Sequence, residues 1–220
     1  MKKKIYYIDS KTKEFLQSKE IDTKFFGVNV PNTTDIKPLE TKDNFAVCFN
    51  KGKWEYVEDN RSKTAYSITD KSESKVDYLG SIKDGFTLLK PQETDKWDGL
   101  KWIDDLELLK TQKLSNMKTT YQIESTANVL YKNVLYKGGD SSASAIAGAV
   151  NLAQSLQESN VKIIASDDSA NEMSFSEALE LSGLIARSWR TAFFRYKELK
   201  LEITNSKTVE ELNSISWEEV

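Results

Sequence analysis

The sequence predicts an α+β protein with a small antiparallel β-rich N-terminal domain, a helical connector, and a C-terminal α/β domain whose long helix packs on a small sheet. Short apolar runs split by polar or glycine turns fill the first half, and all three prolines lie there. In the second half, apolar residues instead recur at steps of three and four, which is helical spacing. We therefore expect a β-rich module at 1–95, a connector at 96–125 and a second domain at 126–220.

Two hairpins are expected near the N-terminus. The runs KIYYID and FLQSKEI are separated by the polar DSKTKE, and NFAVCFN and KWEYVED flank Lys51-Gly52, which suits a tight turn. The runs TAYSITD, KVDYLGSI and GFTLLKP continue the pattern as further short strands. The strands are too short for a large core, so single large rings should anchor the packing. Cys48 lies in the apolar FAVCF and is expected to be a buried small residue.

The connector is expected to be a helix with a narrow apolar face. Apolar residues fall at roughly helical spacing from Leu106 to Tyr121, with polar residues between them. Asp98 or Asp104 is the expected N-cap. A helix with so few apolar positions is expected to pack against a partner chain or a neighbouring domain.

The long helix of the C-terminal domain is the strongest element in the sequence. Ser174 and Glu177 form an S-x-x-E capping box at its start. Apolar residues then recur in a near-heptad stripe made of Ala178, Leu181, Ile185, Trp189, Ala192, Tyr196, Leu199 and Ile203. The stripe either covers the sheet or forms a seam between protomers. We expect Ile185, Trp189, Tyr196 and Leu199 to pack within the domain, with part of the stripe left for an oligomer contact.

The segment KGGDSSASAIAGAV, residues 137–150, raises the question of a phosphate site, because glycines precede a helix. No lysine follows the glycines as a Walker loop requires, and Asp140 would repel phosphate. We therefore expect a turn and a helix capped by Asp140 or Ser141. The small residues Ala145, Ala149 and Ala153, beside Gly148, are expected to allow close packing, and Ile146, Val150 and Leu156 are expected to form the apolar stripe.

The composition excludes several classes of chemistry. The chain has no histidine and one cysteine, which removes histidine-based catalysis, disulfides and His- or Cys-based metal sites. Charges of both signs are interspersed, with a net charge of −3, so no basic nucleic-acid surface is expected. No apolar run approaches a membrane span, and the N-terminus lacks the apolar stretch of a signal peptide. We expect no enzyme activity, cofactor, metal, nucleic acid or membrane partner, and a cytoplasmic location.

An ordered set of residues runs through the first half of the chain. Its members are Gly52, Trp54, Asp59, Arg61, Tyr66, Leu79, Gly80, Gly85, Pro91, Trp97, Gly99 and Trp102. The set resembles the pattern of tailed-phage tail fibre assembly proteins, with Ser62 where glycine is usual. The second half, from YKGGDSSASAIAGAV to VEELNSISW, resembles an uncharacterised domain found at the C-termini of phage tail and tail-fibre-associated proteins.

The resemblance implies a non-enzymatic chaperone or accessory protein that binds a tail fibre, or another tail protein, in the host cytoplasm and forms a homo-oligomer. The candidate partner-binding residues are Trp54, Tyr56, Arg61, Tyr66, Trp97 and Trp102. Two alternatives remain. The chain is a structural virion component, such as a tail-tip or baseplate adaptor, or it is a glycan-binding module whose tryptophans stack on sugars.

Overall fold

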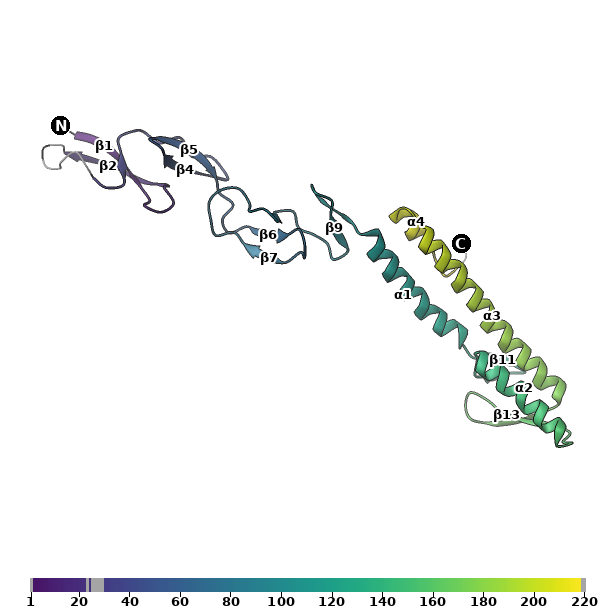
Figure 1. Ribbon diagram of the computed structural model, residues 1–220. Coiled ribbons are helices and arrows are strands. Elements are labelled where there is room, and N and C mark those ends of the chain that lie inside the picture. Colours follow the sequence, from purple (N-terminus) through teal and green to yellow (C-terminus); the bar gives the residue numbers. More distant parts are fainter. Residues whose placement is uncertain (1, 23, 25–29, 219–220) are drawn as a thin grey trace. The chain divides into compact units, whose positions relative to one another are not determined.

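The computed structural model describes residues 2–22, 24 and 30–218. Its contacts divide the chain into two units, Met1–Ile103 and Asp104–Val220. The regular elements described in the first unit are short antiparallel strands, and the second unit is dominated by helices (Figure 1). The predicted α+β class is therefore confirmed. The predicted three-part division stays a prediction.

The first five strands form two antiparallel sheets that contain both predicted hairpins. Their bounds are β1 (Lys2–Ile8), β2 (Phe15–Asp22), β3 (Thr33–Thr34), β4 (Phe45–Asn50) and β5 (Lys53–Glu58). The first sheet has the order β2-β1-β3, and the second pairs β4 with β5. Lys51 and Gly52, between β4 and β5, have φ values of 48° and 82°. A two-residue hairpin turn of the type that matches strand twist requires positive φ at both positions, which Gly52 adopts without strain.

The core of these five strands is aromatic. Trp54 is 7% exposed, and its ring centroid lies 5.9 Å from that of Phe15 and 5.0 Å from that of Phe49. Its indole N–H donates to the Ile36 carbonyl at 2.8 Å. One large ring thus joins both sheets, and its polar atom is satisfied. Cys48 is buried as expected, and burial raises the pKa of its thiol.

The rest of the first unit consists of two smaller sheets. Their strands are β6 (Thr64–Ser67), β7 (Glu73–Lys75), β8 (Phe86–Thr87), β9 (Asp95–Trp97) and β10 (Trp102–Asp104). The first has the order β7-β6-β8, and β9 pairs with β10. The expected strand over KVDYLGSI is wrong beyond its first residues, because pairing with β6 ends at Lys75. The chain then turns away, and the Gly80 N–H donates instead to the Glu58 carbonyl.

The second unit contains four helices and two hairpins. The helices are α1 (Leu106–Ser125), α2 (Asp140–Ser155), α3 (Phe175–Asn205) and α4 (Val209–Ser214). The hairpin strands are β11 (Val129–Tyr131), β12 (Val134–Tyr136), β13 (Val161–Ile164) and β14 (Ala170–Met173). The first half of α3 packs on α2 and the hairpins, and its second half packs on α1 and α4 (Figure 1).

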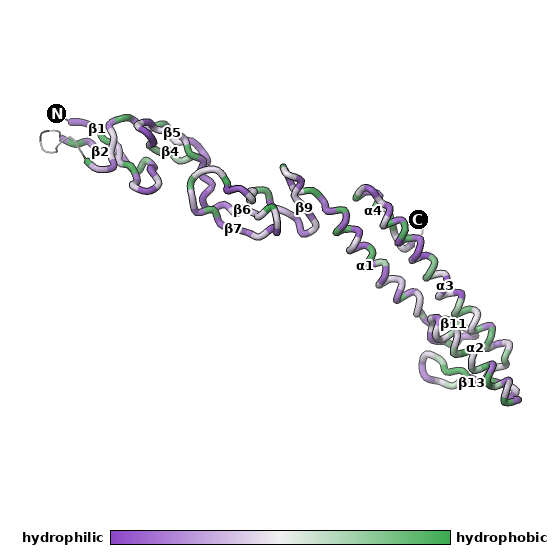
Figure 2. The backbone as a smooth tube through the Cα atoms, viewed as in Figure 1, coloured by the Kyte–Doolittle hydropathy of each residue, from purple (hydrophilic) through white to green (hydrophobic). Residues whose placement is uncertain are grey.

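The predicted apolar stripe of α3 is confirmed. Hydrophobic and hydrophilic residues are interspersed along the helix (Figure 2), and its apolar stripe supplies both cores of the unit. The buried stripe residues are Ala178, Leu181, Ile185, Ala192, Leu199 and Ile203. Ser182 interrupts the stripe but donates to the Ala143 carbonyl of α2 at 2.8 Å, so this buried hydroxyl is satisfied. The Ser174–Glu177 capping box is present, and Lys132 pairs with Glu177.

The expected caps of α1 and α2 were wrong. Asp105 caps α1 by accepting from the Glu107 N–H, one residue after the nearer expected position. At α2 the N-cap is Gly139, no side chain caps it, and Asp140 is already the first helical residue. An acidic group in the first turn still interacts favourably with the helix dipole.

The expected packing of α2 is confirmed for Ile146, Val150 and Ala153 and is wrong for three other residues. Ala145 and Gly148 are exposed, and no atom lies within 4 Å of a Cβ built on Gly148. Leu156 is exposed as well. The buried residues are Ala143, Ile146, Val150 and Ala153. Burying the larger side chains of Ile146 and Val150 removes more apolar area from water, so they fix the rotation of the helix and leave Ala145 and Gly148 exposed.

Candidate protein-binding surfaces

Arg61 forms an ionic clamp between distant parts of the first unit. Its guanidinium donates to both carboxylate oxygens of Glu14, at 2.7 and 3.1 Å, and to Asp59 at 2.6 and 2.8 Å. Glu14 directly precedes β2, and Asp59 directly follows β5. Bidentate hydrogen bonding between a guanidinium and a carboxylate fixes the relative orientation of the two groups in addition to pairing their charges. Arg61 therefore ties the first sheet to the second, and the D-x-R part of the sequence pattern has a structural explanation.

Arg61→Lys is expected to destabilise the first unit by about 1 kcal/mol near neutral pH, because a lysine keeps the charge but loses the forked donors. The Arg61 hydrogen bond lowers the pKa of Asp59. The stabilisation is therefore present above the pKa of an unfolded aspartate and is lost as pH falls through the lower folded pKa. In urea unfolding followed by tryptophan fluorescence, the gap between wild type and variant should shrink from about pH 7 to about pH 3. A gap that stays constant would contradict the clamp.

Tyr56 belongs to an exposed aromatic cluster at the open end of the β4–β5 hairpin. It is 40% exposed, and its ring lies edge-on to Phe45 at a centroid distance of 6.0 Å. The ammonium of Lys42 lies 4.3 Å from the Phe45 ring centroid and 5.5 Å from that of Tyr56. The Tyr56 hydroxyl donates to the Glu40 carbonyl at 2.8 Å, which holds the ring in place. We call Lys42, Phe45 and Tyr56 the Tyr56 cluster.

The sequence pattern indicated Tyr56 but not Phe45 or Lys42. Val47 pairs with Tyr56 across the hairpin, and Phe45 lies two residues before Val47 on the same face. The alternation of Phe45, Val47 and Phe49 was the signal that could have placed Phe45 there. Lys42 carried no such signal, because it lies in the loop before β4.

The other candidate residues of the first unit fall into two groups. Trp54 and Tyr66 are buried, so the surface proposed below does not include them. Trp97 and Trp102 pack edge-on at 5.1 Å across the β9–β10 hairpin and are half-buried. The Trp102 indole donates to the Leu89 carbonyl at 2.7 Å. Each large ring thus anchors a small sheet, and a glycan-binding role for these tryptophans stays a prediction.

The candidate stripe on α3 divides into a buried part and an aromatic part. Ile185 and Leu199 are fully buried. Trp189 and Tyr196 are half-buried, with Trp189 stacked on Phe193 at 5.3 Å and Tyr196 stacked on Tyr121 of α1 at 5.0 Å. Along α3, Trp189 and Tyr196 lie between the residues that enter the two cores. The oligomer contact expected on this stripe stays a prediction.

Comparison with known proteins gives the family. A family model described as "Tail fiber assembly protein, N-terminal domain" matches residues 3–57, which run from β1 into β5. A "Tail fiber assembly protein" of Enterobacteria phage T4 is 32% identical over 127 residues, which are 54% of this chain and 68% of the relative. The chain belongs to the tail fibre assembly protein family.

Other members of the family are similar over the same share of the chain. The "Tail fiber assembly protein" of Escherichia phage lambda is 31% identical over 120 residues, or 53% of this chain and 62% of the relative. The "Prophage tail fiber assembly protein homolog TfaR" of Escherichia coli is 30% identical over 120 residues, or 53% of this chain and 63% of the relative. The chain thus spans less than two thirds of the length of both relatives. No solved structure matches the chain.

These names describe the assembly of a tail fibre, which fits a non-catalytic role. Within the described residues, no group of three or more Cys, Asp or Glu side chains is placed to hold a metal ion. No helix in the part of the chain that the structure describes is both long and apolar enough to cross a membrane.

Proposed function

We propose that this chain is a non-enzymatic accessory protein that binds a tail fibre chain, or its assembly intermediate, in the host cytoplasm. The observation that carries the proposal is the Tyr56 cluster, which lies on the hairpin at the end of the segment matched by the family model. The buried Trp54 and the Arg61 clamp hold that hairpin rigid. The second unit is proposed to dock or to oligomerise through the aromatic part of α3.

The chemistry of the Tyr56 cluster suits a protein partner. Aromatic residues are enriched where protein interfaces are buried, because they bury a large area with few rotatable bonds. The Glu40 hydrogen bond already fixes the Tyr56 ring, so binding orders little that is mobile. Lys42 adds a positive charge beside two ring faces and so favours a partner that carries a carboxylate next to an apolar side chain.

Co-expression with the fibre gene that neighbours this gene tests the proposed function. With the chain present, the yield of folded fibre trimers on a non-denaturing gel is expected to rise. An unchanged yield without the chain contradicts the proposal. Mass spectrometry of purified particles adds a second readout, since stoichiometric presence of the chain in virions would favour the structural alternative.

Tyr56→Ala is expected to weaken fibre binding by about 30-fold, the effect of losing one interface hot spot. Tyr56→Phe keeps the ring but loses the hydrogen bond to Glu40, so it should weaken binding less than Tyr56→Ala. Leu152→Ala removes an exposed apolar side chain from α2 and is the matched control. Pull-down and fibre yield measure the effect. Equal loss in Tyr56→Ala and Leu152→Ala would show that the cluster has no special role.

A further inference from the structure

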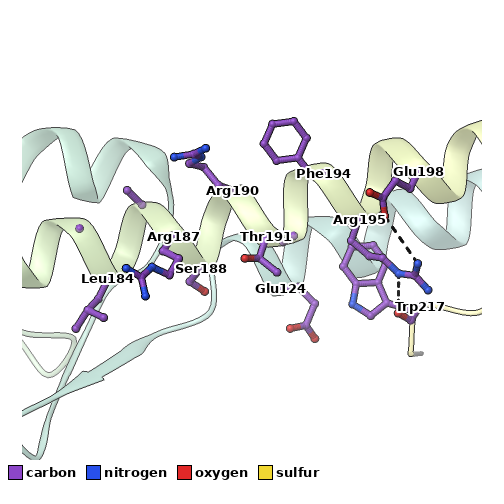
Figure 3. A pocket seen from close by; sticks show the side chains of 13 residues that line it. Glu124, Leu184, Arg187, Ser188, Arg190, Thr191, Phe194, Arg195, Glu198 and Trp217 are labelled. Atoms are coloured by element: carbon purple, nitrogen blue, oxygen red, sulfur yellow. Dashed lines mark hydrogen bonds and ion pairs between the residues drawn. The ribbon is translucent and has the colours of Figure 1, made fainter. Parts of the chain in front are cut away.

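An open groove of about 1280 Å³ runs along α3 in the second unit. Helix α3 supplies most of its lining, together with Glu124 near the end of α1 and Trp217 after α4 (Figure 3). Its apolar surface includes Leu184, Phe194 and Trp217. Phe194 is 54% exposed, a large exposed fraction for a phenylalanine in the middle of a helix.

The groove gathers nearly all the arginine of this protein. The chain has four arginines, and three of them, Arg187, Arg190 and Arg195, line the groove. Elsewhere the chain uses lysine for positive charge, apart from the Arg61 clamp. Arginine differs from lysine in its planar fork, which binds a carboxylate through two parallel hydrogen bonds. The choice of side chain thus indicates a carboxylate-binding surface.

The three arginines have different surroundings. Arg195 donates to the carbonyls of Trp217 and Ser216 at 3.2 and 3.1 Å and lies 4.0 Å from Glu198, so it fixes one wall of the groove (Figure 3). Arg187 and Arg190 are exposed, and no side-chain hydrogen bond or ion pair is found for either within the described residues. Two guanidinium groups are therefore available to a ligand one helical turn from Phe194 and Leu184.

We infer that this groove binds an acidic segment of the assembling fibre that also carries a large apolar side chain. The inference rests on the proposed function. Carboxylates of the segment pair with Arg187 and Arg190, and its apolar side chain packs on Phe194, one helical turn from Arg190. A nucleic acid fits less well, because Glu124 and Glu198 line the same groove and repel a continuous row of phosphates.

A synthetic peptide probe tests the groove independently of any fibre. The probe is a labelled helical peptide of about 15 residues with Leu and Glu at helical spacing, and its control carries Lys in place of Glu. Fluorescence anisotropy with the full chain should show binding of the Glu peptide only, weakening as salt is raised. In R187E/R190E the affinity should fall at least tenfold. K118E/K200E makes the same change in charge at exposed positions outside the groove and should bind normally.

Three results would overturn the inference. The first is equal binding of the Lys and Glu peptides, and the second is unchanged binding of the Glu peptide by R187E/R190E. The third is a wild-type protein that is a dimer by light scattering and that only R187E/R190E converts to a monomer. In that case a second copy of this chain, and not a fibre segment, would occupy the groove. The proposed function fails separately. If fibre yield does not depend on the chain, that function is wrong whatever the peptide does. The other case is that the yield of fibre trimers depends on the chain, while R187E/R190E still supports the full yield and still binds the Glu peptide. Then only the groove inference is wrong.

Discussion

Gly138→Ala is expected to destabilise the second unit by more than about 3 kcal/mol, a larger loss than most single substitutions cause. A Cβ at this position would lie 2.0 Å from the carbonyl oxygen of Ala127 and 2.9 Å from its carbon. Both are backbone atoms, so no side chain can rotate away to relieve the overlap. Ala127 follows α1 and Gly138 precedes α2, so the contact joins the exit of one helix to the entrance of the next.

Gly148→Ala is the matched control for this prediction. Gly148 lies inside α2, and a Cβ there would meet nothing within 4 Å. Alanine in a helix interior is more favourable than glycine by about 0.5–1 kcal/mol, so this variant should be slightly more stable than wild type. Urea unfolding followed by helical circular dichroism measures both. Midpoints that move in the same direction would show that the close approach at Gly138 is unimportant.

Trp54→Ala is expected to destabilise the first unit by about 3–5 kcal/mol, which is comparable to the whole stability of a small domain. The substitution removes the ring that packs on Phe15 and Phe49 and leaves the Ile36 carbonyl without its donor. Hydrogen exchange read by mass spectrometry should show loss of protection in the peptides of β1, β4 and β5. Peptides of α3 in the same sample report any effect on the second unit.

Trp97→Ala tests whether this effect is specific to a core position. Trp97 is half-buried and packs edge-on to one other ring, Trp102. An aromatic pair of this kind contributes about 1 kcal/mol to stability beyond the burial of its apolar area. The pair lies in the β9–β10 hairpin, so hydrogen-exchange protection in β1 and β5 should be nearly unchanged. Similar loss of protection in both variants would mean that Trp54 is not the anchor of the first two sheets.

Local patterns predicted the elements best. The two N-terminal hairpins follow from alternation and from the Lys51-Gly52 turn, and α3 follows from its stripe and capping box. These features depend on residues close together in the chain, so the sequence states them directly. In α2 the pattern correctly placed Ile146 and Val150 on the apolar stripe but did not separate the buried Ala153 from the exposed Ala145 and Gly148. The small residues are spread around the helix, and only the tertiary packing of Ile146 and Val150 decides which side is buried.

The surfaces were harder to predict than the elements. Arg61 was selected from the family pattern, but its partner Glu14 lies 47 residues earlier, and no local rule connects the two. The Tyr56 cluster needs a loop lysine that only the folded chain brings to the rings. The three arginines of α3 were visible as an exception in a lysine-rich chain, yet their common groove depends on Trp217 from beyond α4.

Helix α3 has a consequence for how the second unit melts. Its 31 residues span about 46 Å, and one end lies in the core with α2 while the other lies in the core with α1. A shared helix transmits the loss of one core to the other, because fraying either half removes hydrogen bonds on which the next turn depends. The two cores should therefore behave as one cooperative foldon rather than as two. The second unit is therefore expected to unfold in a single thermal transition.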